Sequence, residues 1–295
     1  MRYAILGVGG VGGLVGGALA RSQREVLLLL TERSLGEYPG VLRVESEALG
    51  DFEVSVPAAA RLDRDVDVLW VTVKAAALDA ALALAPPELV GEAMVVPLLN
   101  GVDHMAILRE RYGSRAVAGS MSVESEKVDP GHVVQRGPLA AINLAPDRGA
   151  DALVEEVRAA GFTASVLESE ARVLWTKLAI LAPLALGTSS VQAPMGPVRA
   201  DAEVWELVLA CATEACKVAE IEGVVLDDAR IHRVLEGAPP GMRSSMQKDL
   251  ASHRPLELEA IAGPILRRGA EHGIPTPATE ELSRRVLAQV AAAAR

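Results

Sequence analysis

The sequence predicts an α/β domain followed by an all-α domain, and three observations carry this prediction. In the first half of the chain, short apolar runs typical of strands alternate with helical runs. After about residue 168, only helical periodicity remains. The length of 295 residues is also too great for one ordinary core. We therefore expect two domains, residues 1–167 and residues 168–295.

The first hundred residues predict four parallel strands. The strand segments are YAIL at 3–6, EVLLLL at 25–30, VDVLWVTV at 66–73 and AMVVPLL at 93–99. Small residues at 10–20 and alanine-rich residues at 75–85 predict helices between them. Strands that alternate with such helices form βαβ units and hence a parallel sheet.

The rest of the chain predicts short strands and then helices. The segments 115–123, 131–137 and 140–145 predict strands on a mixed edge of the same sheet, and 163–167 a last strand after a helix at 150–160. The second domain predicts helices at 169–187, 200–223, 227–236, 242–251, 255–272 and 278–294. Proline and glycine separate these helices.

Charge and composition exclude several classes of function. A net charge of −10 argues against binding to nucleic acid or to an acidic membrane, because either needs a basic face. The five histidines and two cysteines show no metal-ligand spacing, so we expect no metal. The uncharged run 178–198 contains three prolines and several polar residues, which argues against a membrane span. We expect a cytoplasmic protein without a signal peptide, because the chain starts with a strand pattern.

A glycine motif follows the first predicted strand. Gly7, Gly9 and Gly12 stand in the spacing G-x-G-x-x-G, directly before a predicted helix. The first glycine allows a tight turn, the second a close approach of the backbone to a pyrophosphate, and the third close packing of helix on strand. The helix N-terminus then offers N–H groups and a positive dipole end to the phosphates. The first domain is therefore predicted to be a Rossmann-type dinucleotide-binding domain.

The residues after the second strand bear on which dinucleotide binds. An acidic side chain about twenty residues beyond the glycines favours NAD, and an arginine favours NADP. Glu32 stands at that offset, between Thr31 and Arg33. Either Glu32 accepts a hydrogen bond from the ribose, or Thr31 and Arg33 hold a 2′-phosphate while Glu32 faces solvent. The sequence leaves both options open.

A single charge, Lys177, lies in the apolar run LWTKLAILAPLAL at 174–186. One interpretation is that this lysine lies at a helix edge and extends its ammonium to water. The other is that burial lowers its proton affinity, which makes it suitable as an acid or base near neutral pH.

Other polar residues have ordinary interpretations when taken alone. Glu257 in PLELEAIAG suits a solvated helix face, and Ser244 and Ser245 suit a helix N-cap. Asn100 begins a common turn pair with the glycine after it, and Lys74 suits an exposed position after a strand.

Four segments beside the glycine motif nevertheless complete a pattern. They are VTVKA with Lys74, LLNGV with Asn100, LWTKLA with Lys177, and SSMQKDL with PLELEAIAG, which carry Ser245 and Glu257. In the order and spacing of these segments, the chain resembles the ketopantoate reductases, which make pantoate for coenzyme A. The resemblance extends from residue 1 to about 280, and the segments of Lys177 and Glu257 are its most specific parts.

The resemblance implies an enzyme that transfers hydride from NADPH to the keto group of a small 2-keto acid, 2-dehydropantoate above all. Lys177 would give a proton to the keto oxygen, where a desolvated ammonium also stabilises the negative charge that develops. Glu257 would bind the hydroxyl end of the substrate, and Ser245 would help to hold the substrate. Asn100 would contact both cofactor and substrate, and Lys74 would lie on the cofactor side. The sequence does not fix the oligomeric state, and a homodimer is one option.

Two departures from the family pattern leave alternatives open. Asparagines that the family carries four and eight residues after the lysine are Leu181 and Ala185 here, and the arginine for the 2′-phosphate is Thr31. The alternatives are a related nicotinamide-dependent 2-keto or hydroxy acid reductase with a more apolar substrate, and NAD in place of NADP. A third alternative is a dinucleotide-binding sensor without turnover, against which the retention of Lys177 and Glu257 argues.

Overall fold

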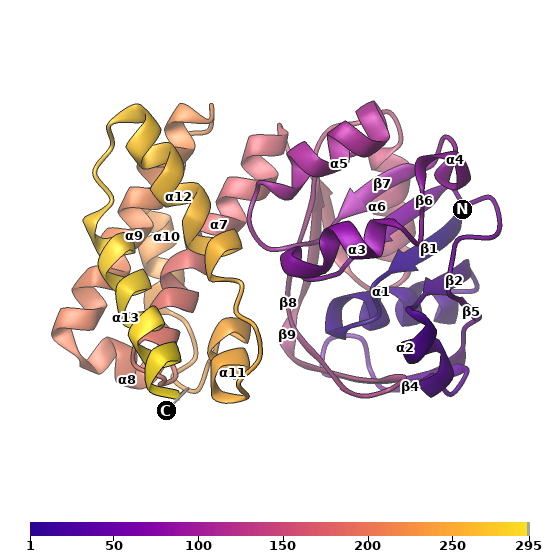
Figure 1. Cartoon of the computed structure of the whole chain (residues 1–295), viewed down its shortest axis with the longest axis horizontal. Helices are drawn as coiled ribbons and strands as arrows, with labels where there is room; N and C mark the ends of the chain where they lie inside the picture. The colour runs from indigo at the N-terminus through magenta and orange to yellow at the C-terminus, as the bar shows by residue number, and fades with distance from the viewer. Residues whose placement is uncertain (294–295) are drawn as a thin grey trace. The chain divides into compact units, whose positions relative to one another are not determined.

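The computed structural model describes residues 1–293, and the chain forms two compact units (Figure 1). The first unit contains Met1–Leu99 and His104–Val173, and the second contains Asn100–Asp103 together with the chain from Leu174 onward. The domain boundary at residue 168 remains a prediction from the sequence.

The first unit contains a five-stranded parallel sheet. Its strands are β1 (Arg2–Leu6), β2 (Glu25–Leu29), β5 (Ala58–Ala59), β6 (Val68–Val71) and β7 (Met94–Pro97). They lie in the order β5-β2-β1-β6-β7, and every pair is parallel. The strand order therefore reverses direction between β1 and β6, where open α/β sheets bind ligands at the carboxyl ends of the strands. The predicted Rossmann-type fold is confirmed.

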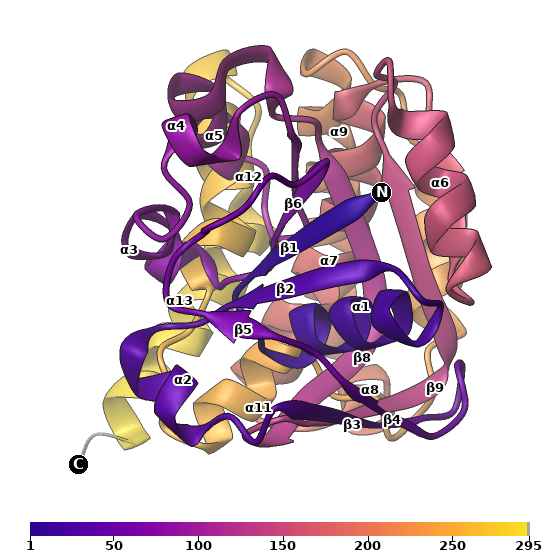
Figure 2. The same cartoon turned by 90° about the vertical axis from the view of Figure 1, so that its right-hand side faces the viewer.

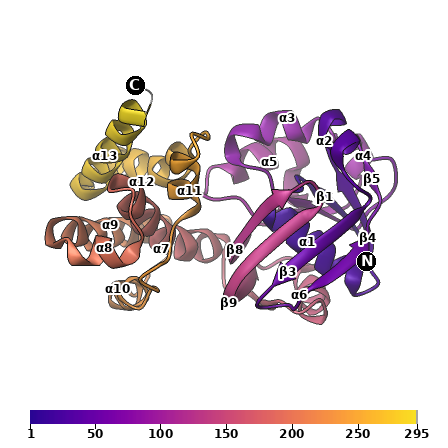
Figure 3. The same cartoon turned by 90° about the horizontal axis from the view of Figure 1, so that it is seen from below.

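A second, mixed sheet corrects one prediction. It contains β3 (Val41–Ser46), β4 (Phe52–Ser55), β8 (Gly119–Asp129), β9 (His132–Leu144) and β10 (Thr163–Val166). The strands β8 and β9 form a long antiparallel hairpin (Figure 3), and β9 also pairs in parallel with β3 and β10. The prediction that residues 115–145 lie on an edge of the first sheet is wrong.

The error has a local cause in β9. The predicted strands 131–137 and 140–145 are one strand, and its register with β8 shifts between the pairs Val123–Ala140 and Glu124–Arg136. The residues between Arg136 and Ala140 are therefore extra on β9, and Gly137 among them has a φ of +73°. Such an irregularity bends a strand without ending it, so its Gly-Pro pair resembles a turn in the sequence.

Helix α1 (Gly10–Arg21) lies between the two sheets (Figure 2). A Cβ at Gly12 or Gly16 would press on residues of the parallel sheet or the loop after it, including Ile5. A Cβ at Gly13 or Gly17 would press on the second sheet, at Val133 and Val44. The small residues of α1 thus let both sheets approach one helix closely, which the sequence prediction of a small-residue helix did not anticipate.

Shorter helices complete the first unit. The predicted helix at 75–85 is shorter than expected. It consists of a 3-10 turn at Ala75–Ala77 followed by a short α-helix at Leu78–Leu82. The helix predicted at 150–160 is confirmed, and it packs on β10. These elements are α2 (Glu32–Glu37), η1 (Ala75–Ala77), α3 (Leu78–Leu82), α4 (Pro87–Val90), α5 (His104–Tyr112), η2 (Gly113–Arg115) and α6 (Ala150–Ala159).

The second unit is helical, as predicted. Helix α9 is its centre, because α8, α10, α12 and α13 all pack against it. Helix α8 lies in a segment that the sequence predicted to be a break, and residue 294 of the last predicted helix lies outside the described residues. The helices are α7 (Glu170–Ser190), α8 (Met195–Ala200), α9 (Ala202–Ile221), α10 (Asp228–Glu236), α11 (Ser245–Ala251), α12 (Leu258–His272) and α13 (Pro277–Ala293).

Among residues 1–293, α7 is the one helix whose length and composition would suit a membrane span. However, 72% of its most apolar window is buried inside the structure. The core helix of a globular domain has the same composition, because it is buried on most sides. We therefore describe α7 as a core helix.

Candidate functional site

The glycine motif forms the loop between β1 and α1. Gly7 has a φ of +96°, and a Cβ there would overlap the side chain of Val73. A Cβ at Gly12 would overlap the carbonyl oxygen of Gly7. Glycine is therefore required at both positions for steric reasons within the fold.

Gly9 differs from its two neighbours in the motif. It is the N-cap of α1, no side chain caps the helix there, and a Cβ at Gly9 would meet no atom of the described chain within 4 Å. The first N–H groups of α1 thus have no side-chain cap, and the positive end of the helix dipole lies at this point. This arrangement fits the pyrophosphate of a dinucleotide, whose oxygens accept hydrogen bonds from such groups.

Two residues after β6 support the loop. The hydroxyl of Thr72 donates to the carbonyl oxygen of Gly7 at 2.5 Å and lies 3.2 Å from that of Leu6. Lys74 follows two residues later, is exposed and precedes η1. The structure therefore brings Thr72 to the glycine loop, a contact that the sequence prediction missed.

The residues after β2 are exposed. Thr31 is the N-cap of α2, and its hydroxyl accepts a hydrogen bond from the backbone N–H of Ser34 at 3.3 Å. Glu32 is the first residue of α2. Arg33 has a side chain that is 89% exposed and pairs with Glu37 at 3.2 Å. The Arg33 guanidinium thus takes part in a weak surface ion pair.

In the second unit, Lys177 lies on α7 and is partly buried. Burial lowers the pKa of Lys177 to about 8, and the carboxylate of Glu257 opposes this shift. The desolvation of Lys177 on α7 thus has the direction that the second interpretation of this lysine requires. One turn further along α7, Leu181 is partly buried, and Ala185 is fully buried.

Asn100 and Glu257 are joined directly. The side-chain amide of Asn100 donates to Oε2 of Glu257 at 2.9 Å. Glu257 precedes α12, and its side chain makes no cap hydrogen bond to that helix. Gly101 has a φ of +84°, and a Cβ there would overlap the carbonyl oxygen of Ala260. The Asn100-Gly101 turn thus packs on the first turn of α12.

The two serines before and at the start of α11 have different positions. Ser244 is buried, accepts from the backbone N–H of Gln247 at 3.0 Å and lies 2.8 Å from the Thr188 hydroxyl. Ser245 is exposed at the first position of α11. The N-cap is therefore Ser244, and the structure does not bring Ser245 into the hydrogen-bonded pair of Asn100 and Glu257.

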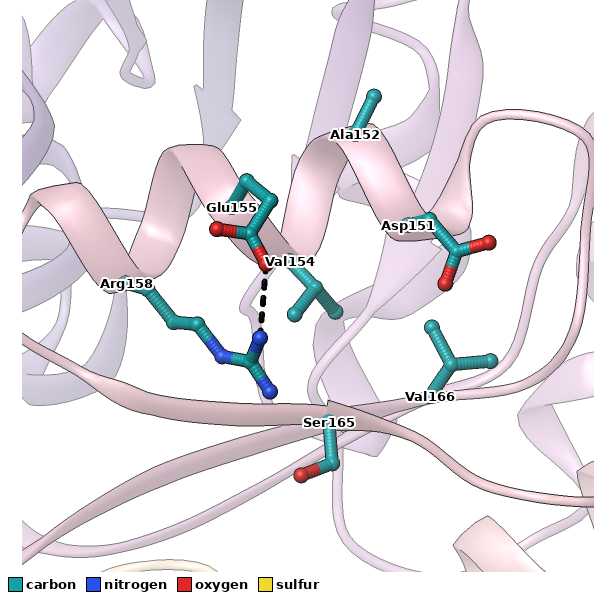
Figure 4. A pocket seen from close by; sticks show the side chains of 7 residues that line it. All are labelled: Asp151, Ala152, Val154, Glu155, Arg158, Ser165 and Val166. Carbon is teal, nitrogen blue, oxygen red and sulfur yellow. Dashed lines mark hydrogen bonds and ion pairs between the residues drawn. The ribbon is translucent and has the colours of Figure 1, made fainter.

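A surface pocket of about 480 Å³ lies elsewhere in the first unit, against α6 and β10 (Figure 4). The guanidinium of Arg158 donates to Glu155 at 2.7 Å and to the carbonyl oxygen of Ala164 at 2.9 Å. This pocket shares no lining residue with the glycine loop. Within the described part of the chain, no group of three His, Cys, Asp or Glu side chains could hold a metal ion.

Comparison with known proteins gives consistent results for both units. The family model for ketopantoate reductase PanE/ApbA matches residues 3–149, and the model for its C-terminal part matches residues 171–289. A 2-dehydropantoate 2-reductase of Halobacterium salinarum is 30% identical over 301 aligned residues, which cover 96% of this chain and 97% of that protein.

Solved structures agree with the fold. The crystal structure of a PanE/ApbA family ketopantoate reductase from Ralstonia eutropha is 28% identical, has a TM-score of 0.88 and is matched over 100% of both chains. A D-mandelate dehydrogenase solved with NADH and anilino(oxo)acetate is 23% identical, has a TM-score of 0.88 and is matched over 99% of both chains. The second likeness concerns the fold alone.

Proposed function

The chain belongs to the ketopantoate reductase family, and from that premise we propose that it reduces the keto group of 2-dehydropantoate to give pantoate, with NADPH as the hydride donor. At the coarser level, it is an oxidoreductase that uses a nicotinamide cofactor on a small 2-keto acid. The observation that carries the proposal is the lysine of α7, whose pKa of about 8 reflects its burial and the nearby Glu257 carboxylate.

Lys177 is the proton donor in this proposal. The nicotinamide, when bound, supplies hydride to the keto carbon, and the keto oxygen then needs a proton. The ammonium of Lys177 stabilises negative charge on that oxygen and gives it the proton, after which the lysine takes a proton from solvent. A pKa close to the working pH suits this cycle, because both protonation states are then accessible.

Glu257 and Asn100 bind the substrate in this proposal. The hydrogen bond from Asn100 fixes one carboxylate oxygen of Glu257 and so orients the whole group. A fixed carboxylate accepts a hydrogen bond from a substrate hydroxyl in a defined direction. Asn100 would also contact the cofactor, and Lys74 would lie on the cofactor side. Ser245 would reach the substrate from the exposed start of α11.

The glycine loop of Gly7, Gly9 and Gly12 would hold the cofactor through the N–H groups of α1. For the 2′-phosphate of NADPH, the proposed ligands are Arg33 and Thr31, which are exposed after β2. Glu32 opposes this choice, because a carboxylate directed at the ribose would repel the phosphate and favour NADH. The cofactor is tested by the ratio of kcat/KM for NADPH and NADH in wild type and in Glu32→Ala. A wild-type preference for NADH that reverses in the variant would overturn the choice of NADPH.

The function is tested by following oxidation of NADPH and NADH in the presence of 2-dehydropantoate. Turnover of 2-dehydropantoate with either nicotinamide cofactor is the expected result. Reduction of the unhydroxylated acid alone would contradict the substrate assignment but not the reaction type. We also expect a cytoplasmic protein that forms a homodimer. Sedimentation of the purified protein would test the dimer.

A second substrate class is favoured by Leu181 and Ala185. Both continue the helical face of Lys177, because residues four and eight positions apart lie on one side of a helix. Neither side chain forms a hydrogen bond with a substrate hydroxyl. The same reaction on a more apolar 2-keto acid is therefore the second candidate function.

A further inference from the structure

The segment Asn100–Asp103 belongs to the second unit, although the residues on both sides of it in sequence belong to the first. Leu99 and His104, its direct neighbours, are both in the first unit. Gly101 and Val102 in the middle of the segment are buried, whereas Asn100 and Asp103 at its two ends are partly exposed and make polar contacts. The contacts at its two ends are both made with α12 or the residue before it.

Asp103 makes the contacts at the end of the segment. Its Oδ2 lies 2.5 Å from Nη2 of Arg267, and its Oδ1 lies 2.9 Å from Nη1 of Arg268. Each carboxylate oxygen thus has its own guanidinium. Charge-assisted hydrogen bonds of this kind are directional, which fixes the position of the carboxylate as well as its charge.

Arg268 is itself held firmly. Its Nε donates to Glu222 at 2.8 Å, its guanidinium lies 5.7 Å from the centre of the Trp175 ring, and its side chain is only 22% exposed. Arg267 has a further partner in Glu259. Asp103 therefore binds one arginine that other contacts hold in place, Arg268, and a second, more exposed arginine, Arg267.

At the other end of the segment are the contacts of the candidate site. Asn100 donates to Glu257, and Gly101 packs against Ala260. The segment therefore runs along α12, from the residue before the helix to its third turn. A displacement of Asp103 would be passed through two intervening residues to the Asn100 amide.

We propose that Asp103 is a positioning residue, whose ion pairs with Arg267 and Arg268 hold the Asn100–Asp103 segment on α12 and thereby keep the Asn100 amide on the Glu257 carboxylate. This rests on the proposed function, in which Asn100 and Glu257 bind the substrate. The ion pairs are partly exposed and add little to the free energy of unfolding individually. Their effect is on the geometry of the site.

The proposal has a consequence for Lys177. The two influences on the lysine are its desolvation, which lowers the pKa, and the Glu257 carboxylate, which raises it. When Asp103 no longer holds the segment, Asn100 no longer fixes Glu257, and the carboxylate moves more freely. The mean attraction between Glu257 and the ammonium then weakens, so the pKa of Lys177 falls further.

The experiment compares Asp103→Ala, Asp103→Glu and Glu259→Gln with wild type. Asp103→Ala is expected to raise KM for 2-dehydropantoate roughly tenfold, because misplaced binding groups weaken substrate capture, with kcat and NADPH affinity changed much less. Asp103→Glu keeps both carboxylate oxygens and should restore most of the wild-type KM. Glu259→Gln is the matched control, because Arg267 loses its other carboxylate partner while Asp103 stays in place.

A titration that needs no turnover accompanies the kinetics. The side-chain NMR signal of Lys177, assigned with Lys177→Arg, is followed against pH in wild type and in Asp103→Ala. A lower pKa in Asp103→Ala and an unchanged pKa in Glu259→Gln support the positioning role. An unchanged Lys177 pKa and KM in Asp103→Ala, with only a lower Tm, would overturn it. If wild type does not reduce 2-dehydropantoate, the proposed substrate fails, and the titration still decides whether Asp103 positions Glu257.

Discussion

In the first unit, the candidate cofactor site is built from backbone. Its features are the positive φ of Gly7, the uncapped N-terminus of α1 and the open space at Gly9. In the second unit, the candidate substrate site is built from side chains, namely the ammonium of Lys177 and the bonded pair of Asn100 and Glu257. Backbone sites depend on the absence of side chains, whereas the second site depends on charges held in place. The two should therefore respond to mutation in different ways.

The largest expected effect is at Lys177. Lys177→Ala removes the proposed proton donor, and loss of a general acid typically lowers kcat by about 10²–10⁴. Dinucleotide affinity should stay within error, since the glycine loop belongs to the other unit. Steady-state kinetics and a cofactor titration measure the two quantities. Lys217→Ala, an exposed lysine on α9, is the matched control. A Lys177→Ala enzyme with near-normal kcat would remove the lysine from the mechanism.

Within the glycine loop, two substitutions separate folding from binding. Gly12→Ala forces a Cβ onto the Gly7 carbonyl, and overpacking of this kind typically costs about 1–3 kcal/mol in the free energy of unfolding. Gly9→Ala meets open space, so stability should change by less than about 0.5 kcal/mol. Its dinucleotide affinity should still fall roughly tenfold, because the methyl group occupies the approach of the pyrophosphate.

Denaturant unfolding measures the stability of Gly12→Ala and Gly9→Ala, and a fluorescence titration with NADPH measures their cofactor affinity. Gly36→Ala is the control. Gly36 lies in α2, and a Cβ there would also meet nothing within 4 Å among residues 1–293. Equal NADPH affinity in wild type and Gly9→Ala would show that the phosphates do not approach this loop.

A smaller effect is expected at Leu181. Leu181→Asn places an amide one turn after Lys177, where it can pair with a substrate hydroxyl. We expect kcat/KM for 2-dehydropantoate to rise about two- to tenfold relative to an unhydroxylated 2-keto acid of similar size, since one hydrogen bond contributes about 0.5–1.5 kcal/mol. The same ratio in Ile180→Asn, which places the amide one position earlier on α7, is the control. High selectivity for 2-dehydropantoate in wild type would show that the apolar residue does not limit recognition.

The smallest expected effect is a shift in pH dependence. Activity requires the ammonium form of Lys177, so kcat should fall as the pH rises through the lysine pKa of about 8. Glu257→Gln removes the carboxylate that raises this pKa, so the basic limb should move to lower pH. A pH profile of kcat for both enzymes measures the shift. A limb that does not move, or moves to higher pH, would show that Glu257 does not act on the lysine.

The sequence predicted the features that depend on neighbouring residues. The glycine loop follows a strand within twelve residues of the N-terminus, and its spacing expresses local steric needs. The unusual setting of Lys177 was also visible, because the apolar stretch around it is continuous. The helical second unit followed from periodicity alone.

Features that depend on distant residues were not predictable in the same way. The second sheet pairs β3 with β9, about ninety residues later, and no local pattern specifies that pairing. The alternation of buried Leu42 and Val44 with Arg43 was the available signal for β3. Asp103 was missed because its importance lies in Arg267 and Arg268, more than 160 residues away.

The assignment of Asn100–Asp103 to the second unit also matters for recombination between related enzymes. A chimera with a single crossover near residue 168 would join α12 of one parent to the 100–103 segment of the other. Asp103 would then come from one parent, and the arginines at positions 267 and 268 from the other. An exchange that transfers residues 100–103 together with residues 174–295 keeps these partners from one parent. The natural module for exchange is therefore discontinuous in sequence.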